Sequence, residues 1–232
     1  GTPIHIKIQG NTMPVNQQVM LPDMIEKIAF ELMSPDQIKT FEATMEMNLS
    51  FGVPNIGNFR VNIFRQRGSI SIVVRFILGN IPKLDALELP PVLADLIMEK
   101  RGLVLIVGAT GSGKSTTIAS MLDHRNSNRA GHILTVEDPI EYLFRHKKSI
   151  VNQREIGLDT RDWQSALKNA MRQAPDCILI GEIRDKETMQ AAIAYAQTGH
   201  LCLATLHANN SYHALNRIIS FFPLENRPAL FL

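Results

Sequence analysis

The sequence predicts an α/β protein in which a small α+β domain precedes a larger domain built on a mainly parallel sheet. Three observations support this. Short strand-like segments with two helices among them fill residues 1–78, three prolines fall within residues 79–91, and strands alternate with longer helices over residues 92–232. Such alternation is typical of a parallel sheet with right-handed crossovers. We therefore expect two domains joined by a linker over residues 79–91.

The N-terminal domain is expected to begin with a strand. Isoleucine occupies every second position from Ile4 to Ile8, and this period of two indicates a half-buried strand. Apolar residues then recur at helical spacing over residues 21–33. Ser34 followed by Pro35 is typical of a helix start, because serine caps the first turn and proline fits the first helical position. A second helix is therefore expected through residue 47.

Three further strands are expected to complete the N-terminal domain. Apolar and polar residues alternate over residues 57–67 and again over residues 69–78, and Gly68 between them indicates a hairpin. Residues 48–53 form the third strand-like stretch. Strands joined by such short connections pair antiparallel.

The larger domain is expected to contain four strands and five helices. Its predicted strands cover residues 103–107, 132–136, 177–180 and 200–205, with an edge hairpin around residues 149–155. Its predicted helices cover residues 92–101, 114–126, 161–173, 186–197 and 212–222. The first and third of these strands are apolar throughout, as expected of strands buried on both faces of a sheet.

The composition narrows the class of protein. Hydrophobic residues make up 45% and charged residues 20% of the 232 residues, which is close to the average for soluble globular proteins and excludes a disordered chain. The apolar runs are too short to span a membrane, and the N-terminus does not resemble a signal peptide. A net charge of +2 gives no support for nucleic-acid binding by bulk electrostatics. Two cysteines cannot form a disulfide framework, so we expect small core residues in a reducing, cytoplasmic environment.

The strongest motif is a phosphate-binding loop. Residues 108–115 match the pattern G-x-x-x-x-G-K-[ST] between a predicted strand and a predicted helix. Glycines let successive backbone N–H groups turn toward a phosphate, the lysine reaches the β- and γ-phosphates, and the serine hydroxyl binds Mg²⁺. The alternative, a tight turn without a ligand, fits this setting poorly. The expected nucleotide-binding residues are Gly108, Ala109, Thr110, Gly111, Ser112, Gly113, Lys114, Ser115 and Thr116.

Acidic residues follow two of the predicted strands, and a histidine follows a third. Residues 137–141 read Glu-Asp-Pro-Ile-Glu, residues 181–185 read Gly-Glu-Ile-Arg-Asp, and His207 comes after the last strand. The carboxyl ends of parallel strands meet at one edge, where ligands bind. We therefore expect these side chains beside the phosphate loop. For Asp138 and Asp185 the sequence leaves open whether they act there or cap helices.

These motifs, in this order, resemble the secretion ATPases of type II secretion and type IV pili. The resemblance covers nearly the whole chain and is greatest for the retraction branch, the PilT/PilU family. Residues 171–176 and 201–210 favour the PilU type. The resemblance implies a PAS-like N-terminal domain over residues 1–78 and a RecA-like ATPase domain over residues 92–232. It also implies a further helical region beyond residue 232.

The resemblance also implies roles for three residues of the larger domain. Glu141 would be the catalytic glutamate that orients or deprotonates the attacking water. Glu182 would act on Mg²⁺, directly or through a water. The choice of general base stays open between these two. His207 would sense the γ-phosphate, although a histidine packed in the core is the alternative.

Two arginines of the N-terminal domain complete the predicted site. Arg60 and Arg75 lie on consecutive predicted strands. Taken alone, a basic hairpin is usually a solvated face. In this family, arginines at these positions reach nucleotide phosphates at a subunit interface, where an arginine supplied by a neighbour stabilises the transition state. The resemblance thus implies a homo-oligomeric ring, expected to be a hexamer.

We therefore expect a Mg²⁺-dependent, ATP-hydrolysing hexameric motor subunit that powers type IV pilus retraction in twitching motility. Its expected partners are a paralogous retraction ATPase and the inner-membrane platform protein of the pilus. No nucleic-acid partner is expected. It would be a cytoplasmic protein, peripheral at the inner membrane.

Three other functions are alternatives to this expectation. One is a pilus assembly or type II secretion ATPase, although the zinc-binding tetracysteine insertion common in those proteins is missing here. A second is a low-turnover, ATP-binding auxiliary subunit that docks on an active retraction ATPase. A nucleic-acid motor is disfavoured by the balanced charge.

Overall fold

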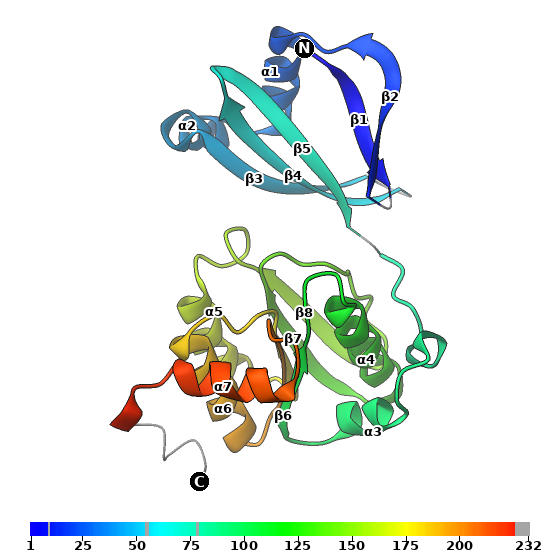
Figure 1. Cartoon of the computed structure of the whole chain (residues 1–232), viewed down its shortest axis with the longest axis vertical. Helices are drawn as coiled ribbons and strands as arrows, with labels where there is room; N and C mark the ends of the chain where they lie inside the picture. Colours follow the sequence, from blue (N-terminus) through cyan, green and yellow to red (C-terminus); the bar gives the residue numbers. More distant parts are fainter. Residues whose placement is uncertain (9, 54–55, 78, 226–232) are drawn as a thin grey trace. The chain divides into compact units, whose positions relative to one another are not determined.

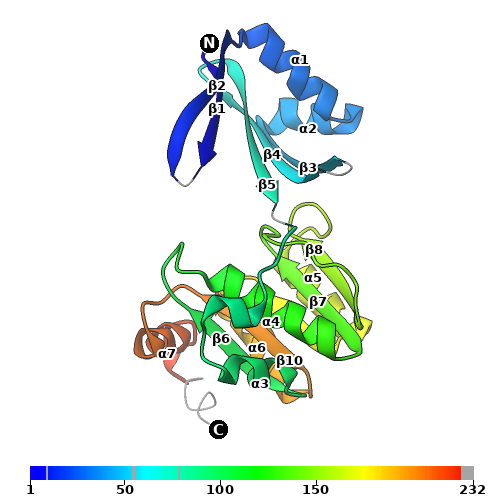
Figure 2. The same cartoon turned by 90° about the vertical axis from the view of Figure 1, so that its right-hand side faces the viewer.

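The computed structural model describes residues 1–8, 10–53, 56–77 and 79–225. Its contacts divide the chain into two compact units, Gly1–Ile77 and Leu78–Leu232. Figures 1 and 2 show both units from two directions. Every sheet and every apolar core of the described residues lies within one of the two units.

The first unit is built on an antiparallel meander with two helices against it. Strands β3 (Glu46–Val53), β4 (Gly57–Gln66) and β5 (Ser69–Ile77) pair in that order. Helices α1 (Pro22–Leu32) and α2 (Pro35–Thr44) pack on the sheet through a shared core. The core is formed by Ala29, Met33, Phe41, Leu49, Val61, Ile63 and Ile70.

A second, two-stranded sheet precedes α1. Strand β1 (Pro3–Ile8) pairs antiparallel with β2 (Asn11–Val19). The sequence predicts the first of these strands and no element over the second. The predicted half-burial of the first strand is wrong, because Ile4, Ile6 and Ile8 are all exposed. In β2 every residue is exposed, so the burial pattern of a half-buried strand is missing there.

Helix α2 begins where the sequence predicts and ends earlier than predicted. Ser34 Oγ accepts a hydrogen bond from the Gln37 N–H at 3.3 Å, and Gln37 Oε1 accepts one from the Ser34 N–H at 2.8 Å, which forms a capping box. The predicted extension through residue 47 is wrong. Met45 adopts the left-handed region with φ of 64°, and β3 then begins at Glu46, where pairing with β4 supplies the backbone hydrogen bonds.

The second unit contains five parallel strands. They are β6 (Gly102–Val107), β7 (Gly131–Glu137), β8 (Ser149–Glu155), β9 (Cys177–Ile180) and β10 (Leu201–Leu206). The order across the sheet is β6-β10-β9-β7-β8. The predicted hairpin around residues 149–155 is wrong, because this stretch is one edge strand that runs parallel to β7 from the pair Gly131 and Ser149 onward.

Helices cover both faces of this sheet. One core packs α3 (Val92–Met98) and α4 (Lys114–Asn128) on one face, and the other core packs α5 (Trp163–Ala170), α6 (Lys186–Gln197) and α7 (Ser211–Ser220) on the opposite face. Two short 3₁₀ helices, η1 (Leu84–Leu87) and η2 (Met171–Gln173), complete the unit. Among the described residues, every helix is too short or too polar to traverse a bilayer.

Both cysteines belong to these cores. Cys177 on β9 and Cys202 on β10 are fully buried, as expected of small core residues. Burial raises the pKa of the Cys177 thiol to about 12, so the thiol stays neutral at physiological pH.

The parallel sheet brings distant parts of the chain to one edge. The loop after β6 leads into α4, the acidic residues follow β7, Glu182 follows β9 and His207 follows β10. Because all five strands run in the same direction, these segments leave the sheet at the same edge.

Candidate active site

The loop between β6 and α4 needs glycine for its backbone path. Gly111 and Gly113 have φ of 79° and 91°, in the left-handed region that side chains disfavour. A Cβ at Gly108 would lie 2.5 Å from Ser112 Oγ, so a side chain there would displace the Ser112 hydroxyl. The three glycines thus allow the tight turn that precedes α4.

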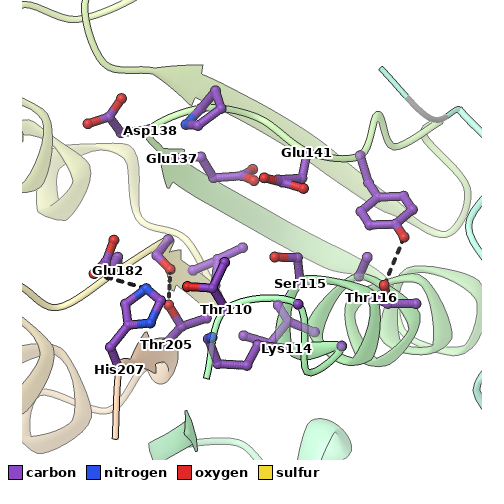
Figure 3. Close-up of a pocket in the computed structure, with 18 of the residues that line it drawn as sticks. Thr110, Lys114, Ser115, Thr116, Glu137, Asp138, Glu141, Glu182, Thr205 and His207 are labelled. Carbon is purple, nitrogen blue, oxygen red and sulfur yellow. Dashed lines mark hydrogen bonds and ion pairs between the residues drawn. The ribbon is translucent and has the colours of Figure 1, made fainter. Parts of the chain in front are cut away.

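The first turn of α4 presents a cation and two hydroxyl groups. Lys114 Nζ donates hydrogen bonds to the carbonyls of Gly108 at 2.9 Å and Ala109 at 2.8 Å, so its ammonium lies over the loop. Ser115 and Thr116 follow Lys114. Figure 3 shows Ser115 facing the carboxylates of Glu137 and Glu141. The N-terminus of a helix attracts anions through its unpaired N–H groups and its dipole.

The acidic segment, residues 137–141, brings two carboxylates together. Figure 3 shows the carboxylates of Glu137 and Glu141 pointing toward one another above Ser115. Glu141 is exposed, whereas Glu137 is only 8% exposed. Burial raises the pKa of Glu137 to about 7, and hydrogen bonds from Thr135 Oγ1 at 2.6 Å and Gln153 Nε2 at 3.4 Å oppose that rise. The site therefore contains one carboxyl group that titrates near neutral pH.

Glu182 lies between an arginine and the histidine. Arg184 Nε is 2.9 Å from Glu182 Oε2, and His207 Nε2 is 3.3 Å from Glu182 Oε1. Arg184 Nη1 also reaches Asp138 Oδ2 at 3.2 Å. Glu182, by hydrogen bond and by charge, raises the pKa of Arg184. Arg184 thereby ties the end of β9 to the acidic segment after β7.

The two aspartates left open by the sequence have different roles. Asp185 Oδ1 accepts a hydrogen bond from the Thr188 N–H at 2.8 Å and forms a capping box at the start of α6. Asp138 pairs with Arg184 instead. The capping interpretation therefore holds for Asp185.

A glycine brings the ends of β7 and β9 close together. The Gly181 N–H donates to the Val136 carbonyl at 2.8 Å. A Cβ at Gly181 would lie 3.1 Å from Glu137 Cα and 3.2 Å from the Val136 carbonyl oxygen. Glycine permits this approach, which places Glu182 beside the acidic segment.

One cavity of about 450 Å³ collects most of the predicted residues of the second unit. The predicted site residues that line this cavity are Thr110, Gly111, Gly113, Lys114, Ser115, Thr116, Glu141, Glu182 and His207. Gly108, Ala109 and Ser112 belong to the same loop. Three strand ends and one helix start thus converge on a single cavity, as the parallel topology requires.

The oxygen atoms around Ser115 suit a hard divalent cation. Mg²⁺ prefers hydroxyl and carboxylate oxygens, and proteins usually bind it through one or two side chains together with substrate phosphates. Among the described residues, His, Cys, Asp and Glu side chains form no group of three that could hold a metal ion. The donor set therefore fits Mg²⁺ that arrives with a nucleotide better than a protein-only metal centre.

Comparison with known proteins identifies the family. The family described as type II/IV secretion system protein matches residues 10–223. The chain belongs to this family. The resemblance inferred from the motifs is confirmed.

Relatives of this secretion system protein family match nearly the whole chain. It is 50% identical over 225 residues to the type IV pilus ATPase PilU of Pseudomonas aeruginosa, covering 97% of this chain and 59% of that protein. It is 40% identical over 227 residues to the retraction ATPase PilT of the same organism, covering 98% of this chain and 66% of that protein. The chain thus spans about three fifths of the PilU relative and is more similar to it than to PilT, as predicted.

A solved structure confirms the fold class. The pilus retraction motor PilT, whose crystal structure contains bound ADP, superposes with a TM-score of 0.93 at 43% identity. The match covers 99% of this chain and 67% of that one. The α/β class, with an N-terminal α+β domain followed by a RecA-like domain, is therefore the fold of this family member.

The two predicted arginines of this family member lie in the first unit. Arg60 on β4 and Arg75 on β5 are direct cross-strand partners. Arg60 is partly buried and Arg75 is exposed. Two guanidinium-bearing residues thus occupy facing positions of this sheet.

Sequence reasoning missed three residues of the site. Arg184 belongs to the motif at residues 181–185, in which no role was predicted for it. Tyr142 directly follows Glu141, and no role was predicted for it either. Gln153 lay in the wrongly predicted hairpin. Its Nε2 donates to the Tyr142 carbonyl at 2.8 Å and its Oε1 accepts from the Phe144 N–H at 2.9 Å. The sequence could have indicated Tyr142, because it is adjacent to a predicted catalytic residue. No feature of the sequence indicates a role for Gln153.

Proposed function

We propose that this chain is the nucleotide-hydrolysing part of an ATPase motor subunit that powers type IV pilus retraction. The observation that carries the proposal is the convergence of Lys114, Ser115 and Glu141 on one cavity (Figure 3). The ATPase names of the PilU and PilT relatives and the ADP bound in the PilT structure support it.

The loop and the first turn of α4 would bind the nucleotide. Backbone N–H groups of residues 108–116 would face the phosphates, and the Lys114 ammonium would exchange its two loop carbonyls for phosphate oxygens. Ser115 and Glu182 would hold Mg²⁺, which neutralises charge on the β- and γ-phosphate oxygens. Since both oxygens of Glu182 have side-chain partners, contact through a water is favoured.

Glu141 is the better candidate for the general base. Its carboxylate is exposed to the cavity, whereas that of Glu182 is engaged by Arg184 and His207. The water oxygen would attack the γ-phosphorus, the bond from phosphorus to the β–γ bridging oxygen would break, and the water proton would pass to Glu141. His207, linked to Glu182, would respond to the γ-phosphate.

Arg60 and Arg75 would complete the site from a neighbouring subunit of a ring, which we propose to be a hexamer. As direct partners on β4 and β5, the two cations would be close enough together to contact the phosphates of one nucleotide in the cavity of another copy. Exposed apolar side chains on β1 and β2 support burial against another surface: Ile4, Ile6, Ile8, Met13, Val15 and Val19.

In this proposal the ring works at the inner membrane with a paralogous retraction ATPase and the platform protein of the pilus. The higher identity to PilU than to PilT supports a second candidate, an auxiliary subunit of low turnover that docks on an active ring. The two candidates differ in the ATPase rate of the isolated protein.

The test compares the purified protein with Glu141→Gln at saturating ATP and Mg²⁺. We expect Glu141→Gln to lower kcat by about 100-fold or more, because general-base catalysis contributes on the order of 10²–10⁴ in rate. ATP affinity should change little, since the loop and Lys114 bind the phosphates.

Glu42→Gln is the matched control, because Glu42 is an exposed glutamate on α2. It should keep the rate of the unchanged protein. Equal, substantial rates in the Glu141→Gln variant and the unchanged protein would remove Glu141 from the mechanism. ATP binding with negligible turnover in the unchanged protein would favour the auxiliary subunit.

A further inference from the structure

Two hydroxyl groups connect the acidic segment to the phosphate-binding helix. Tyr142 Oη and Thr116 Oγ1 are 2.9 Å apart, although 26 residues separate them in the sequence. Tyr142 directly follows Glu141, and Thr116 directly follows Ser115. This hydrogen bond, drawn as a dashed line in Figure 3, therefore joins the neighbour of the proposed base to the neighbour of the proposed Mg²⁺ ligand.

Loss of this hydrogen bond would leave a buried hydroxyl group without a partner. Tyr142 is only 9% exposed. A buried tyrosine hydroxyl requires a partner, because an unsatisfied buried polar group costs about 1–3 kcal/mol. A hydroxyl has one donor and two acceptor sites, so Thr116 can accept from Tyr142 and still donate to a phosphate oxygen.

The backbone around Glu141 is fixed on its other side by β8. Gln153 bonds the Tyr142 carbonyl and the Phe144 N–H, and Glu155 Oε2 accepts from the Ile140 N–H at 3.0 Å. These bonds fix the segment relative to the edge strand. The Tyr142 hydroxyl fixes it relative to α4, the element that carries Lys114 and Ser115.

We infer that Tyr142 is a positioning residue for ATP hydrolysis: its hydroxyl, bound to Thr116, holds the Glu141 carboxylate in register with the phosphate-binding turn of α4. The inference rests on the proposed function of Glu141. Tyr142 acts through Glu141 and has no role in proton transfer. Nucleotide affinity should depend little on it, whereas the rate of the chemical step should depend on it strongly.

The central experiment is Tyr142→Phe, which removes one oxygen atom and keeps the ring. We expect kcat to fall about tenfold with ATP affinity within about twofold, because a displacement of about 1 Å in a reacting group costs up to about 100-fold in rate. Affinity is measured with a fluorescent ATP analogue, and kcat by phosphate release at saturating ATP and Mg²⁺.

Tyr195→Phe is the matched control. The Tyr195 hydroxyl donates to the Leu167 carbonyl and is likewise buried, but it joins α6 to α5 away from the cavity. This variant should lower the thermal midpoint and keep kcat. Both variants lose a buried hydrogen bond, so both should lose stability. Only Tyr142→Phe should also lose kcat, which distinguishes positioning of Glu141 from a general loss of stability.

Substitutions of Thr116 test its role as the hydrogen-bond partner of Tyr142. Thr116→Val removes the partner of the tyrosine hydroxyl and should lower kcat about tenfold, as Tyr142→Phe does, whereas Thr116→Ser keeps a hydroxyl and should have a higher kcat than Thr116→Val. Because both changes break one hydrogen bond, adding Tyr142→Phe to Thr116→Val should lower kcat no further. Multiplied losses in the double variant would overturn the inference.

Two outcomes separate this inference from the proposed function. A full rate in Tyr142→Phe, with the rate lost in Glu141→Gln, would overturn the positioning role and leave the function of Glu141 intact. A full rate in Glu141→Gln would overturn both, whatever Tyr142→Phe does, because no base would remain to be positioned.

Discussion

Glu137 carries a carboxyl group at the buried end of β7, beside a second carboxylate. Burial raises its pKa to about 7, against 4.5 for an ordinary glutamate. Its carboxylate accepts hydrogen bonds from Thr135 and from the backbone N–H of Glu141. A proton on Glu137 near neutral pH lowers the repulsion between the two carboxylates, so the state of Glu137 affects the group proposed as the base.

Glu137 should make stability depend on pH. Between about pH 4.5 and about pH 7 the folded chain keeps a proton that the unfolded chain has lost, so the free energy of unfolding falls as the pH rises through this window. The fall should reach at most about 3 kcal/mol. We expect Glu137→Gln to remove it, as measured by denaturant unfolding without nucleotide at several pH values.

Glu42→Gln serves as the control for this measurement, since Glu42 is exposed. Its stability should follow that of the unchanged protein at each pH. Parallel curves for Glu137→Gln and the unchanged protein would show that Glu137 titrates in its ordinary range.

At the scale of elements, α4 connects the site to the rest of the second unit. At its far end Arg125 donates to the carbonyls of Ile97 at 2.6 Å and Glu99 at 2.9 Å, and Arg129 donates to the Met98 carbonyl at 2.8 Å. These are the last carbonyls of α3, which a helix leaves unpaired. The helix that begins at the phosphate loop thus also caps α3.

Removal of Arg125 should destabilise the second unit. Arg125 is 1% exposed, so Arg125→Ala leaves a cavity and unpaired carbonyls and should lower the free energy of unfolding by about 2–4 kcal/mol. Arg125→Met fills the space without donating hydrogen bonds and should recover part of the loss. Arg129→Ala, at a half-buried position with one such hydrogen bond, should cost less than Arg125→Ala.

Denaturant unfolding at fixed pH measures all three variants. Equal stability of Arg125→Ala and Arg129→Ala would show that burial of the guanidinium offsets its hydrogen bonds. Burial lowers the pKa of Arg125 because it disfavours the charged guanidinium, and this cost opposes the stabilisation by its hydrogen bonds.

At the scale of the whole molecule, the proposed site needs two copies of the chain. The cavity belongs to the second unit, whereas Arg60 and Arg75 belong to the first. If each subunit supplies arginines to the site of its neighbour, mixing two inactive variants should restore ATPase activity. If each subunit has a complete site of its own, mixing should restore none.

We expect two inactive variants to restore activity when mixed. Arg75→Ala keeps its own cavity intact, and Lys114→Ala keeps its own arginines. In randomly mixed rings about a quarter of the sites combine an intact cavity with an intact neighbouring arginine, and these should hydrolyse ATP. The measurement is ATPase activity after the variants are mixed and the rings have reassembled.

A mixture of Lys114→Ala with Glu141→Gln is the control. Both changes damage the cavity within one subunit, so no arrangement of neighbours restores a complete site, and the mixture should stay inactive. Inactivity of the first mixture as well, in rings whose mass in solution is unchanged, would contradict arginine donation between subunits.

The sequence by itself determined the phosphate loop, the cap of α2, the alternation of the second unit and the family. Each depends on short-range rules: glycine where φ is positive, serine before a helix, and an apolar run for a buried strand. The same rules correctly placed the acidic residues and His207 at strand ends, because parallel strands share one edge.

Tertiary structure alone decided the rest. The pairing of β8 with β7, the contact of Glu182 with His207 and the contact of Tyr142 with Thr116 all join residues far apart in the chain. Such contacts depend on strand register and side-chain packing across the sheet, for which local pattern carries no signal. The sequence therefore predicted nine of the residues that line the cavity of the second unit, and packing decided which atoms bind one another.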